Sequence, residues 1–220
     1  MKTNIIYNEN CLDTFKKMGD NSVDIVFTSP PYNRKRNDKY EFYNDQIVDY
    51  FGFLKEVVEQ SIRVSKGNVY FNIMKNYYNK SDVFKLIGEF SDKIYDIFIW
   101  EKTNPLPSSG KAITNAYEFI LVFGDSLKSN KTYTKNHLKT SVAKMKKQHK
   151  AMMHPDVVKF FLENFTSQGD IVYDPFMGCG TTAFVACKMK RQYIGSEIMK
   201  EYCDISYERI KSLKNQTSLF

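Results

Sequence analysis

Short runs of apolar residues alternate with longer amphipathic stretches along most of the chain. The short runs are rich in Val, Ile, Phe and Tyr, and they predict strands over Val23–Phe27, Asn68–Ile73, Ile94–Trp100, Phe119–Phe123, Ile171–Tyr173 and Tyr193–Ser196. The longer stretches have helical periodicity, and they predict helices over Cys11–Met18, Ile47–Val64, Asp82–Phe90, Pro155–Phe165, Thr182–Met189 and Lys200–Ser212. Because strands and helices take turns in this way, we expect an α/β fold with a mainly parallel sheet flanked by helices.

Residues 125–150 interrupt this alternation. They contain eight lysines, one acidic residue and few large apolar side chains. Such a composition is typical of a solvated loop or a small appended lobe rather than of a buried core. We therefore predict a single domain over residues 1–220, in which residues 1–124 and residues 151–220 form two halves on either side of this basic segment.

Positive charge is concentrated in the same segment. The chain has 32 Lys and Arg against 25 Asp and Glu, a net charge of +7. With eight lysines against one acid, the segment accounts for all of this excess, and the remaining residues carry equal numbers of basic and acidic side chains. A local excess of this kind favours a polyanionic partner, with nucleic acid as the first candidate and a membrane surface as the second.

Composition also excludes several classes of protein. The chain is 42% hydrophobic and 26% charged, which is too apolar for a disordered protein. No run approaches the roughly 18 apolar residues of a transmembrane helix, and Met1–Asn8 lacks the pattern of a signal peptide. The cysteines form no C-x-x-C pair and the three histidines are not spaced as ligands beside them. We therefore expect no disulfide framework, no metal site, no membrane partner and a cytoplasmic location.

A glycine-containing turn lies in the C-terminal half. The segment Ile171–Thr182 is an apolar strand that leads into the turn and then into a helix. Gly178 and Gly180 permit positive φ and a close approach of the backbone to a ligand. The next strand ends in Glu197, whose carboxylate can accept hydrogen bonds from two ribose hydroxyls. Since the turn is not G-x-G-x-x-G, these features favour an adenosine-type ligand over a dinucleotide, with a tight turn that binds nothing as the alternative.

A rigid polar turn follows the first predicted strand. Its residues are Ser29, Pro30, Pro31 and Tyr32. The two prolines fix φ and remove two N–H donors, so carbonyl oxygens project from a stiff backbone. Ser29 adds a hydroxyl acceptor and Tyr32 adds a flat aromatic face. Acceptors beside such a face suit the exocyclic amino group of a planar base, and a purely structural turn is the alternative.

The two turns together resemble a known family. The segments Thr28–Asn33, T-S-P-P-Y-N, and Asp174–Thr182, D-P-F-M-G-C-G-T-T, resemble the S-adenosylmethionine-dependent DNA amino-methyltransferases of the β arrangement, in which the catalytic motif precedes the cofactor motif. Ile97–Pro105 is similar to the W-x-K-x-N-P segment of the family, and Tyr117–Phe123 is similar to its following strand. His154 and Pro155 resemble the segment before the glycine turn, so the resemblance covers nearly the whole chain.

This resemblance implies a Rossmann-like methyltransferase fold with a short basic recognition insertion. It makes residues 1–124 the catalytic half, residues 125–150 the target-recognition segment and residues 151–220 the half that binds S-adenosyl-L-methionine. The catalytic residues that it implies are Ser29, Pro30, Pro31 and Tyr32. The cofactor-binding residues that it implies are Asn10, His154, Asp174, Phe176, Gly178, Gly180, Thr181, Thr182 and Glu197.

Double-stranded DNA is the partner that the resemblance implies. Its predicted contacts are Arg34, Lys35, Arg36, Lys128, Lys131, Lys135, Lys139, Lys144, Lys146, Lys147 and Lys150. The chain departs from the family pattern at Glu9-Asn10, where Gly-Asp is common, and at Val158, where a proline is common. A cognate restriction endonuclease and a homodimer are further possible partners, the latter because the recognition segment is short.

The implied reaction begins with a base flipped out of the duplex. Tyr32 stacks on that base, while Ser29 Oγ and the Pro30 carbonyl accept its amino hydrogens. Adenine N6 and cytosine N4 both remain open as targets. Methylation of cytosine C5 is excluded, because no cysteine of the chain has a neighbouring proline. The alternatives are a methyltransferase acting on RNA, protein or a small molecule, and an inactive DNA-binding protein on the same scaffold.

The basic segment yields a first testable prediction. Neutralising several of its eight lysines by substitution with glutamine should weaken DNA binding and flatten its salt dependence, because fewer counterions are released from the phosphates. DNA titrations at several salt concentrations measure both quantities, and the affinity for S-adenosylmethionine serves as the control that stays unchanged. Unaltered DNA affinity and salt slope would instead make the segment a merely solvated face.

Overall fold

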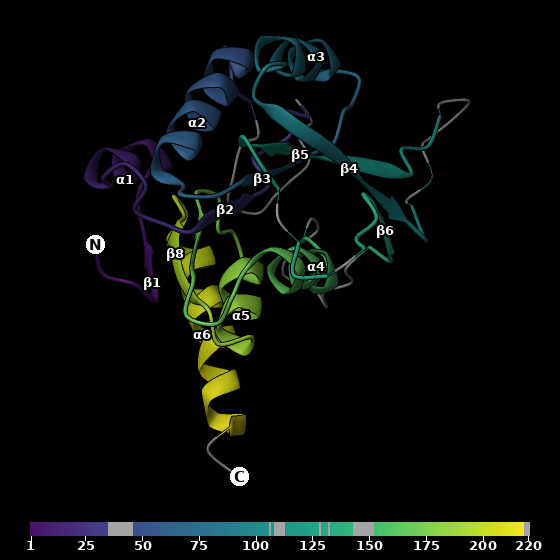
Figure 1. Cartoon of the computed structure of the whole chain (residues 1–220). Helices are drawn as coiled ribbons and strands as arrows, with labels where there is room; N and C mark the ends of the chain where they lie inside the picture. The colour runs from purple at the N-terminus through teal and green to yellow at the C-terminus, as the bar shows by residue number, and fades with distance from the viewer. Residues whose placement is uncertain are drawn as a thin grey trace.

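One sheet organises the chain. The structure is a computed structural model that describes residues 1–34, 46–105, 107, 113–127, 129–131, 133–142 and 152–217, with the backbone alone for 214–217. Within these ranges, eight strands pair in the order β1-β8-β7-β2-β3-β5-β4-β6 (Figure 1). The strands are β1 (Ile5–Tyr7), β2 (Ile25–Thr28), β3 (Val69–Ile73), β4 (Ile94–Lys102), β5 (Tyr117–Phe123), β6 (His137–Thr140), β7 (Ile171–Asp174) and β8 (Gln192–Ser196).

Helices cover both faces of this sheet. They are α1 (Cys11–Lys17), α2 (Tyr50–Val64), α3 (Lys80–Glu89), α4 (Pro155–Phe165), α5 (Thr181–Lys188) and α6 (Lys200–Thr217). Figure 1 shows α2 and α3 on one side of the central strands and α4, α5 and α6 on the other. No helix in the described part of the chain is long and apolar enough to cross a membrane.

The sheet is mainly parallel, as the alternation of elements predicts. Pairs β1–β8, β8–β7, β7–β2, β2–β3 and β4–β6 are parallel. The strand β5 is antiparallel to both of its neighbours, β3 and β4. It is therefore the one reversed strand among those described, and its first residues lie at the edge where the other strands end.

Apolar side chains fill the space on each side of the sheet. The face toward α4, α5 and α6 includes the buried residues Phe27, Tyr70, Phe161, Ala183 and Ile210. The face toward α1, α2 and α3 includes the buried residues Val26, Phe71, Phe15, Leu54 and Leu86. Neighbouring residues of a strand point to opposite faces, so β2 and β3 are buried throughout and need apolar residues at nearly every position.

Two strands escape prediction from the sequence. The first is β1, which pairs in parallel with β8 through only three residues. The second is β6, which lies inside the basic segment 125–150 and pairs with the end of β4. Leu138 is buried and Trp100 Nε1 donates to Thr140 Oγ1 over 2.8 Å, so this part of the segment belongs to the sheet. The prediction of a loop or appended lobe is wrong for residues 137–140.

The predicted helices are confirmed, with shifted ends. Helix α2 begins at Tyr50 rather than at Ile47, because Asp49 accepts a hydrogen bond from Gly52 N and starts the helix there. Helix α3 begins at Lys80, two residues before the predicted start at Asp82. Helix α6 continues to Thr217, beyond its predicted end. Apolar periodicity finds a helix well but locates its ends poorly, since caps decide where a helix starts.

A glycine fixes how α5 packs against α6. Gly180 precedes α5 with φ of 76°, in the left-handed region. A Cβ atom at this position would lie 2.7 Å from both Cβ and Oγ of Ser206 on α6. Ser206 Oγ also donates to Gly178 O over 2.8 Å, which ties α6 to the glycine turn. The missing side chain of Gly180 is therefore explained by helix packing as well as by backbone conformation.

The substitution Gly180→Ala should lower stability by about 2–4 kcal/mol, since it adds steric overlap to the cost of a left-handed alanine. Urea unfolding measures the change. Gly169→Ala is the matched control, because Gly169 also has positive φ, 91°, but a Cβ atom added to it would have no neighbouring atom within 4 Å. That variant should lose only about 1–2 kcal/mol. Equal losses in the two variants would refute the packing explanation.

Candidate active site

The turns that follow β2, β7 and β8 open onto one cavity of about 1240 Å³. They lie together because the carboxyl ends of parallel strands meet at one edge of a sheet. The lining includes residues of the turn Ser29–Tyr32, the glycine turn and Glu197. It also includes Lys102 and Pro107, from the end of β4 and the segment after it. A cavity of this size exceeds the roughly 300–1,000 Å³ of an ordinary ligand pocket, so it can hold a cofactor and a second planar group.

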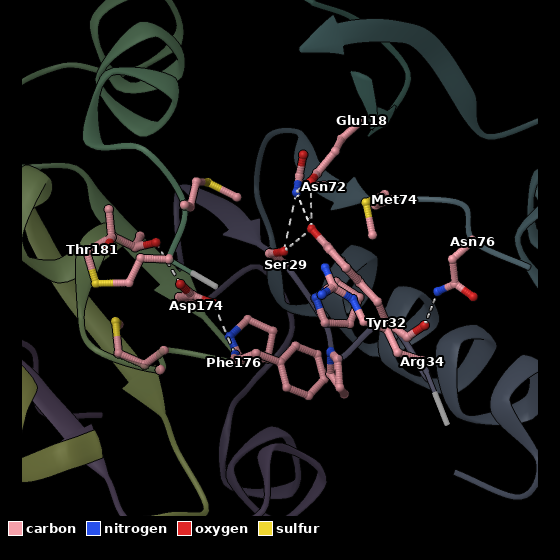
Figure 2. A pocket seen from close by; sticks show the side chains of 18 of the residues that line it. Ser29, Tyr32, Arg34, Asn72, Met74, Asn76, Glu118, Asp174, Phe176 and Thr181 are labelled. Atoms are coloured by element: carbon pink, nitrogen blue, oxygen red, sulfur yellow. Dashed lines mark hydrogen bonds between the residues drawn. The ribbon is translucent and has the colours of Figure 1, made fainter. Parts of the chain in front are cut away.

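Three side chains in the cavity wall hold the hydroxyl group of Tyr32 (Figure 2). The hydroxyl donates to Glu118 Oε2 over 2.7 Å and accepts from Asn72 Nδ2 over 2.6 Å. Ser29 Oγ lies 2.8 Å from the same oxygen. Asn72 Nδ2 also donates to Glu118 Oε2 over 2.7 Å, which joins the four side chains into one network.

Glu118 is buried together with a positive partner. Lys102 Nζ lies 2.5 Å from Glu118 Oε1, and the two side chains are only 10% and 6% exposed. Charges removed from water in this way are tolerated only where their remaining hydrogen bonds are made, and Tyr32 and Asn72 make them on Oε2. Burial, with the neighbouring Glu118 carboxylate, raises the pKa of Tyr32 well above its usual value. The Tyr32 hydroxyl therefore stays protonated and acts as a hydrogen-bond donor.

The network sets the direction of the Ser29 hydroxyl. The hydroxyl group of Tyr32 has one hydrogen. This hydrogen points to Glu118, because a carboxylate paired with Lys102 can only accept. Ser29 must then donate its own hydrogen to the Tyr32 oxygen. Asn72 Nδ2 also donates to Ser29 Oγ over 3.3 Å, a longer contact than those to Tyr32 and Glu118, so one of the two lone pairs on Ser29 Oγ remains. Ser29 Oγ consequently faces the cavity as a hydrogen-bond acceptor.

Some carbonyl oxygens of the same turn accept hydrogen bonds from neighbouring residues, and one does not. Tyr50 donates its hydroxyl hydrogen to Pro31 O over 2.6 Å. Asn76 and Asn79 each donate through Nδ2 to Tyr32 O over 2.8 Å. No hydrogen bond between described residues uses the carbonyl of Pro30, which lines the cavity. Ser29 and Pro30, two consecutive residues that line the cavity, thus each keep acceptor capacity.

Asp174 ties the glycine turn to the end of β2. Its Oδ1 accepts from Thr28 Oγ1 over 2.8 Å and from Phe176 N over 3.0 Å. Its Oδ2 accepts from Thr182 Oγ1 over 2.6 Å. Burial raises the pKa of Asp174 to about 6 despite these hydrogen bonds. The carboxylate joins β2, β7 and α5 at the point where they reach the cavity.

Glu197 lies on the opposite side of the glycine turn, directly after β8. Its Oε2 accepts from Gly178 N and its Oε1 from Met199 N, both over 2.8 Å. Burial raises the pKa of Glu197. A carboxylate has about four acceptor positions, so the bonds from Gly178 N and Met199 N do not use all of them. A Cβ atom on Gly178, whose φ is 51°, would find no atom closer than Phe176 O at 4.0 Å, which leaves open space beside the turn.

Most of the residues predicted for the cofactor line the cavity. They are Asn10, Asp174, Phe176, Gly178, Thr181, Thr182 and Glu197. Asn10 also caps α1 by accepting from Leu12 N over 2.9 Å. Gly180 and His154 are not among the described residues of the lining. His154 caps α4, since its Nδ1 accepts from Asp156 N over 3.2 Å, so the structure does not bring its side chain to the other predicted residues.

The predicted DNA contacts are only partly described. Lys35, Arg36, Lys128, Lys144, Lys146, Lys147 and Lys150 lie outside the described residues. Lys139 Nζ lies 2.6 Å from Glu101 Oε1, and Lys131 Nζ lies 3.9 Å from Glu163 Oε2. Two lysines of the basic segment therefore face acids elsewhere in the fold, which reduces the charge they present to a partner. Arg34 lines the cavity with its guanidinium 5.8 Å from the centre of the Tyr32 ring.

Sequence reasoning does not identify Asn72, Lys102 and Glu118 as site residues. A signal for them exists in the chain, because each is a polar residue in or at the end of an otherwise apolar strand. Asn72 is fully buried in β3, whose other residues are mostly apolar. A buried amide or charge needs a partner, and these three side chains find theirs in one another and in Tyr32.

The buried ion pair can be tested through stability. Lys102→Met should cost about 3–5 kcal/mol of unfolding free energy, because it leaves the Glu118 carboxylate buried without its counter-charge. The double variant Lys102→Met/Glu118→Gln should regain part of that loss. Lys139→Met is the matched control on the neighbouring strand, since its contact with Glu101 is exposed, and it should leave the unfolding free energy almost unchanged. Urea unfolding compares the variants, and equal effects of Lys102→Met and Lys139→Met would contradict the assigned burial.

Comparison with known proteins agrees with this geometry. The chain is 35% identical to the Type II methyltransferase M.MwoI of Methanothermobacter wolfeii over 90% of its own length, and it spans about a third, 34%, of the length of that relative. Among solved structures, it is similar to the PvuII DNA methyltransferase (cytosine-N4-specific), with 20% identity and a TM-score of 0.78 over 95% of this chain and 86% of that one.

A second solved structure, an M1.HpyAVI–SAM complex, matches with 21% identity and a TM-score of 0.67 over 93% of this chain and 98% of that one. At these identities the structures show a shared fold. The sequence itself matches the family model described as DNA methylase over residues 23–208. The match covers both turns of the cavity, and the chain belongs to the DNA methylase family.

Proposed function

We propose that this chain transfers a methyl group from S-adenosyl-L-methionine to the exocyclic amino group of a base in double-stranded DNA. The observation that carries the proposal is the pair of open acceptors, Ser29 Oγ and Pro30 O, in the cavity that also contains the glycine turn and Glu197. An amino group offers two hydrogens, and two adjacent acceptors match it. Membership of the DNA methylase family supports nucleic acid as the substrate.

The residues around the glycine turn fit S-adenosylmethionine. Glu197 keeps acceptor positions for the ribose hydroxyls after its bonds to Gly178 N and Met199 N. The open space beside Gly178 admits a ligand close to the backbone. Phe176 adds an aromatic ring to the lining. When bound, the cofactor supplies a methyl group on a positively charged sulfur, and the relative solved as M1.HpyAVI–SAM complex supports this choice.

The catalytic turn holds and orients the amino group. A base inside a duplex cannot bring its amino nitrogen to the cofactor, so the target nucleotide must be flipped into the cavity. Ser29 Oγ and Pro30 O then accept the two amino hydrogens, which directs the nitrogen lone pair out of the ring system toward the methyl group. The network of Tyr32, Glu118 and Lys102 keeps the Ser29 lone pairs in place. Most of the rate gain would come from this positioning.

Tyr32 contributes through its ring and through its hydroxyl. The hydroxyl is held by Glu118, so the outer end of the ring has a fixed position in the cavity. The Arg34 guanidinium lies 5.8 Å from the ring centre, a cation–π distance. A base that stacks on Tyr32 would use the other face or displace the guanidinium. In either case Arg34 would lie close to the flipped nucleotide, where it suits contact with a phosphate.

Both adenine N6 and cytosine N4 fit the proposal. Each is an amino group conjugated to a ring nitrogen, and the acceptors Ser29 Oγ and Pro30 O serve either one. Type II relatives such as M.MwoI support a role in restriction and modification, with a cognate endonuclease as a possible partner, and an orphan modification enzyme is the other form of the same activity. We also propose action in the cytoplasm and, because the recognition segment is short, binding of DNA as a homodimer.

Transfer of a radiolabelled methyl group to unmethylated genomic DNA fragments tests the proposal. Ser29→Ala should lower kcat about 10²–10³-fold by removing one acceptor of the amino group, and Tyr32→Ala should lower it at least as far. Both variants should still bind S-adenosylmethionine in calorimetry, because neither residue belongs to the glycine turn. Digestion of the product to nucleosides identifies the methylated base. Wild-type protein that binds the cofactor but labels no DNA would refute the function.

A further inference from the structure

Two exposed tyrosines stand at the mouth of the cavity. Tyr77 and Tyr78 lie in the loop between β3 and α3 and are 81% and 49% exposed. Their ring centres are 5.3 Å apart with an interplanar angle of 88°, an edge-to-face pair. Both residues line the cavity. Large aromatic side chains that remain in water at a binding site call for a partner with apolar or π surface.

The loop that carries these tyrosines is held rigidly. Asn76 N donates to Asn79 Oδ1 over 2.6 Å, and Asn76 Oδ1 accepts from Tyr78 N over 2.8 Å and from Asn79 N over 3.1 Å. The side chain of Asn79 is fully buried and also donates to Met74 O over 3.0 Å. Each backbone turn of the loop is thus fixed by an asparagine, so little entropy is lost when its tyrosines bind a partner.

The same asparagines attach the loop to the catalytic turn. Asn76 Nδ2 and Asn79 Nδ2 both donate to the carbonyl oxygen of Tyr32, each over 2.8 Å. Figure 2 shows the Asn76 side chain directed at the backbone of Tyr32. The exposed tyrosines therefore have a fixed position relative to the acceptors for the amino group. A partner that contacts them is placed relative to the reacting centre at the same time.

Positive charge surrounds this aromatic pair. Lys80 Nζ lies 5.7 Å from the centre of the Tyr77 ring, and Lys75 Nζ lies 5.6 Å from that of Tyr117, another exposed tyrosine. In the described part of the chain, no ion pair involves Lys75 or Lys80. The nearest acid along the chain is Asp82, in the first turn of α3. Two uncompensated lysines beside exposed aromatic rings match the phosphates and bases of a nucleic acid strand.

We propose that Tyr77 and Tyr78 form a stacking platform for DNA next to the flipped nucleotide, with Lys75 and Lys80 on the adjacent phosphates. This inference rests on the proposed function and adds a DNA-contacting surface outside the basic segment 125–150. Flipping removes one base from the stack and exposes the face of its neighbour. A rigid tyrosine at the cavity mouth can cover that face and recover part of the lost stacking. This role accounts for the exposure of the two tyrosines, the rigidity of their loop and the lysines beside it.

Steady-state methylation of unmethylated genomic DNA fragments tests the platform. The double variant Tyr77→Ala/Tyr78→Ala should raise the KM for DNA about 10-fold or more, since loss of base stacking weakens binding to that extent. The affinity for S-adenosylmethionine should stay at the wild-type value. Tyr77→Phe/Tyr78→Phe keeps the rings and should recover most of the DNA affinity. Tyr95→Ala is the matched control, because Tyr95 is 52% exposed on β4 and lies outside the lining of the cavity.

The lysines provide an independent measurement. Lys75→Gln/Lys80→Gln should lower the slope of log affinity against log salt concentration by about two, one for each phosphate contact. A double-alanine variant with wild-type KM and a glutamine variant with wild-type salt slope would overturn the platform. A change in molar mass by light scattering without any change in KM would overturn it too, because the loop would then be a contact between copies of the chain. Wild-type protein that labels no DNA removes the proposed function instead, so the two failures are distinct.

Discussion

The carboxylate of Glu118 is the constraint on which the turn Ser29–Tyr32 depends. One of its oxygens is held by Lys102, and the other accepts hydrogen bonds from Tyr32 and Asn72. A buried charge of this kind has no low-energy alternative if a partner is lost, so the arrangement around it is close to all-or-none. Through the single hydroxyl hydrogen of Tyr32, this constraint reaches Ser29, whose Oγ keeps one lone pair after the long contact from Asn72. A simple two-proline turn thereby becomes a directional hydrogen-bonding site.

The two carboxylates beside the glycine turn, Asp174 and Glu197, are held differently from that of Glu118. Asp174 accepts three hydrogen bonds from Thr28, Phe176 and Thr182 and has no positive partner among the described residues. Glu197 likewise accepts backbone N–H groups. In both cases burial raises the pKa, which marks carboxylates that are held by neutral donors rather than by salt bridges. Glu197 forms no ion pair with a described residue, which fits the role proposed for it toward the hydroxyl groups of the cofactor.

The sequence predicts those parts of the site that are continuous in the chain. Ser29–Tyr32 and the glycine turn are each short segments after an apolar strand, and parallel pairing brings strand ends together, so their common cavity could be anticipated. Glu118 and Asn72 lie 86 and 40 residues from Tyr32, and only the completed sheet shows that they meet it. Strand β6 is missed because Leu138 is its single buried residue. The pairing of Lys139 with Glu101 depends on that missed strand, so composition alone does not show that this lysine faces an acid outside the segment.

The reversed direction of β5 affects which part of the cavity wall can vary in length between related proteins. Because β5 runs against its neighbours, β4 ends and β5 begins at the edge of the sheet that borders the cavity. Lys102 is the last residue of β4 and Glu118 is the second residue of β5, so the ion pair lies at the base of one hairpin connection. Described residues of that connection, Pro107, Ile113 and Asn115, line the cavity. Insertions and deletions are tolerated best in such surface connections. The lengthening or shortening of this hairpin could therefore reshape the substrate side of the cavity while the ion pair at its base and the sheet beneath it stay intact.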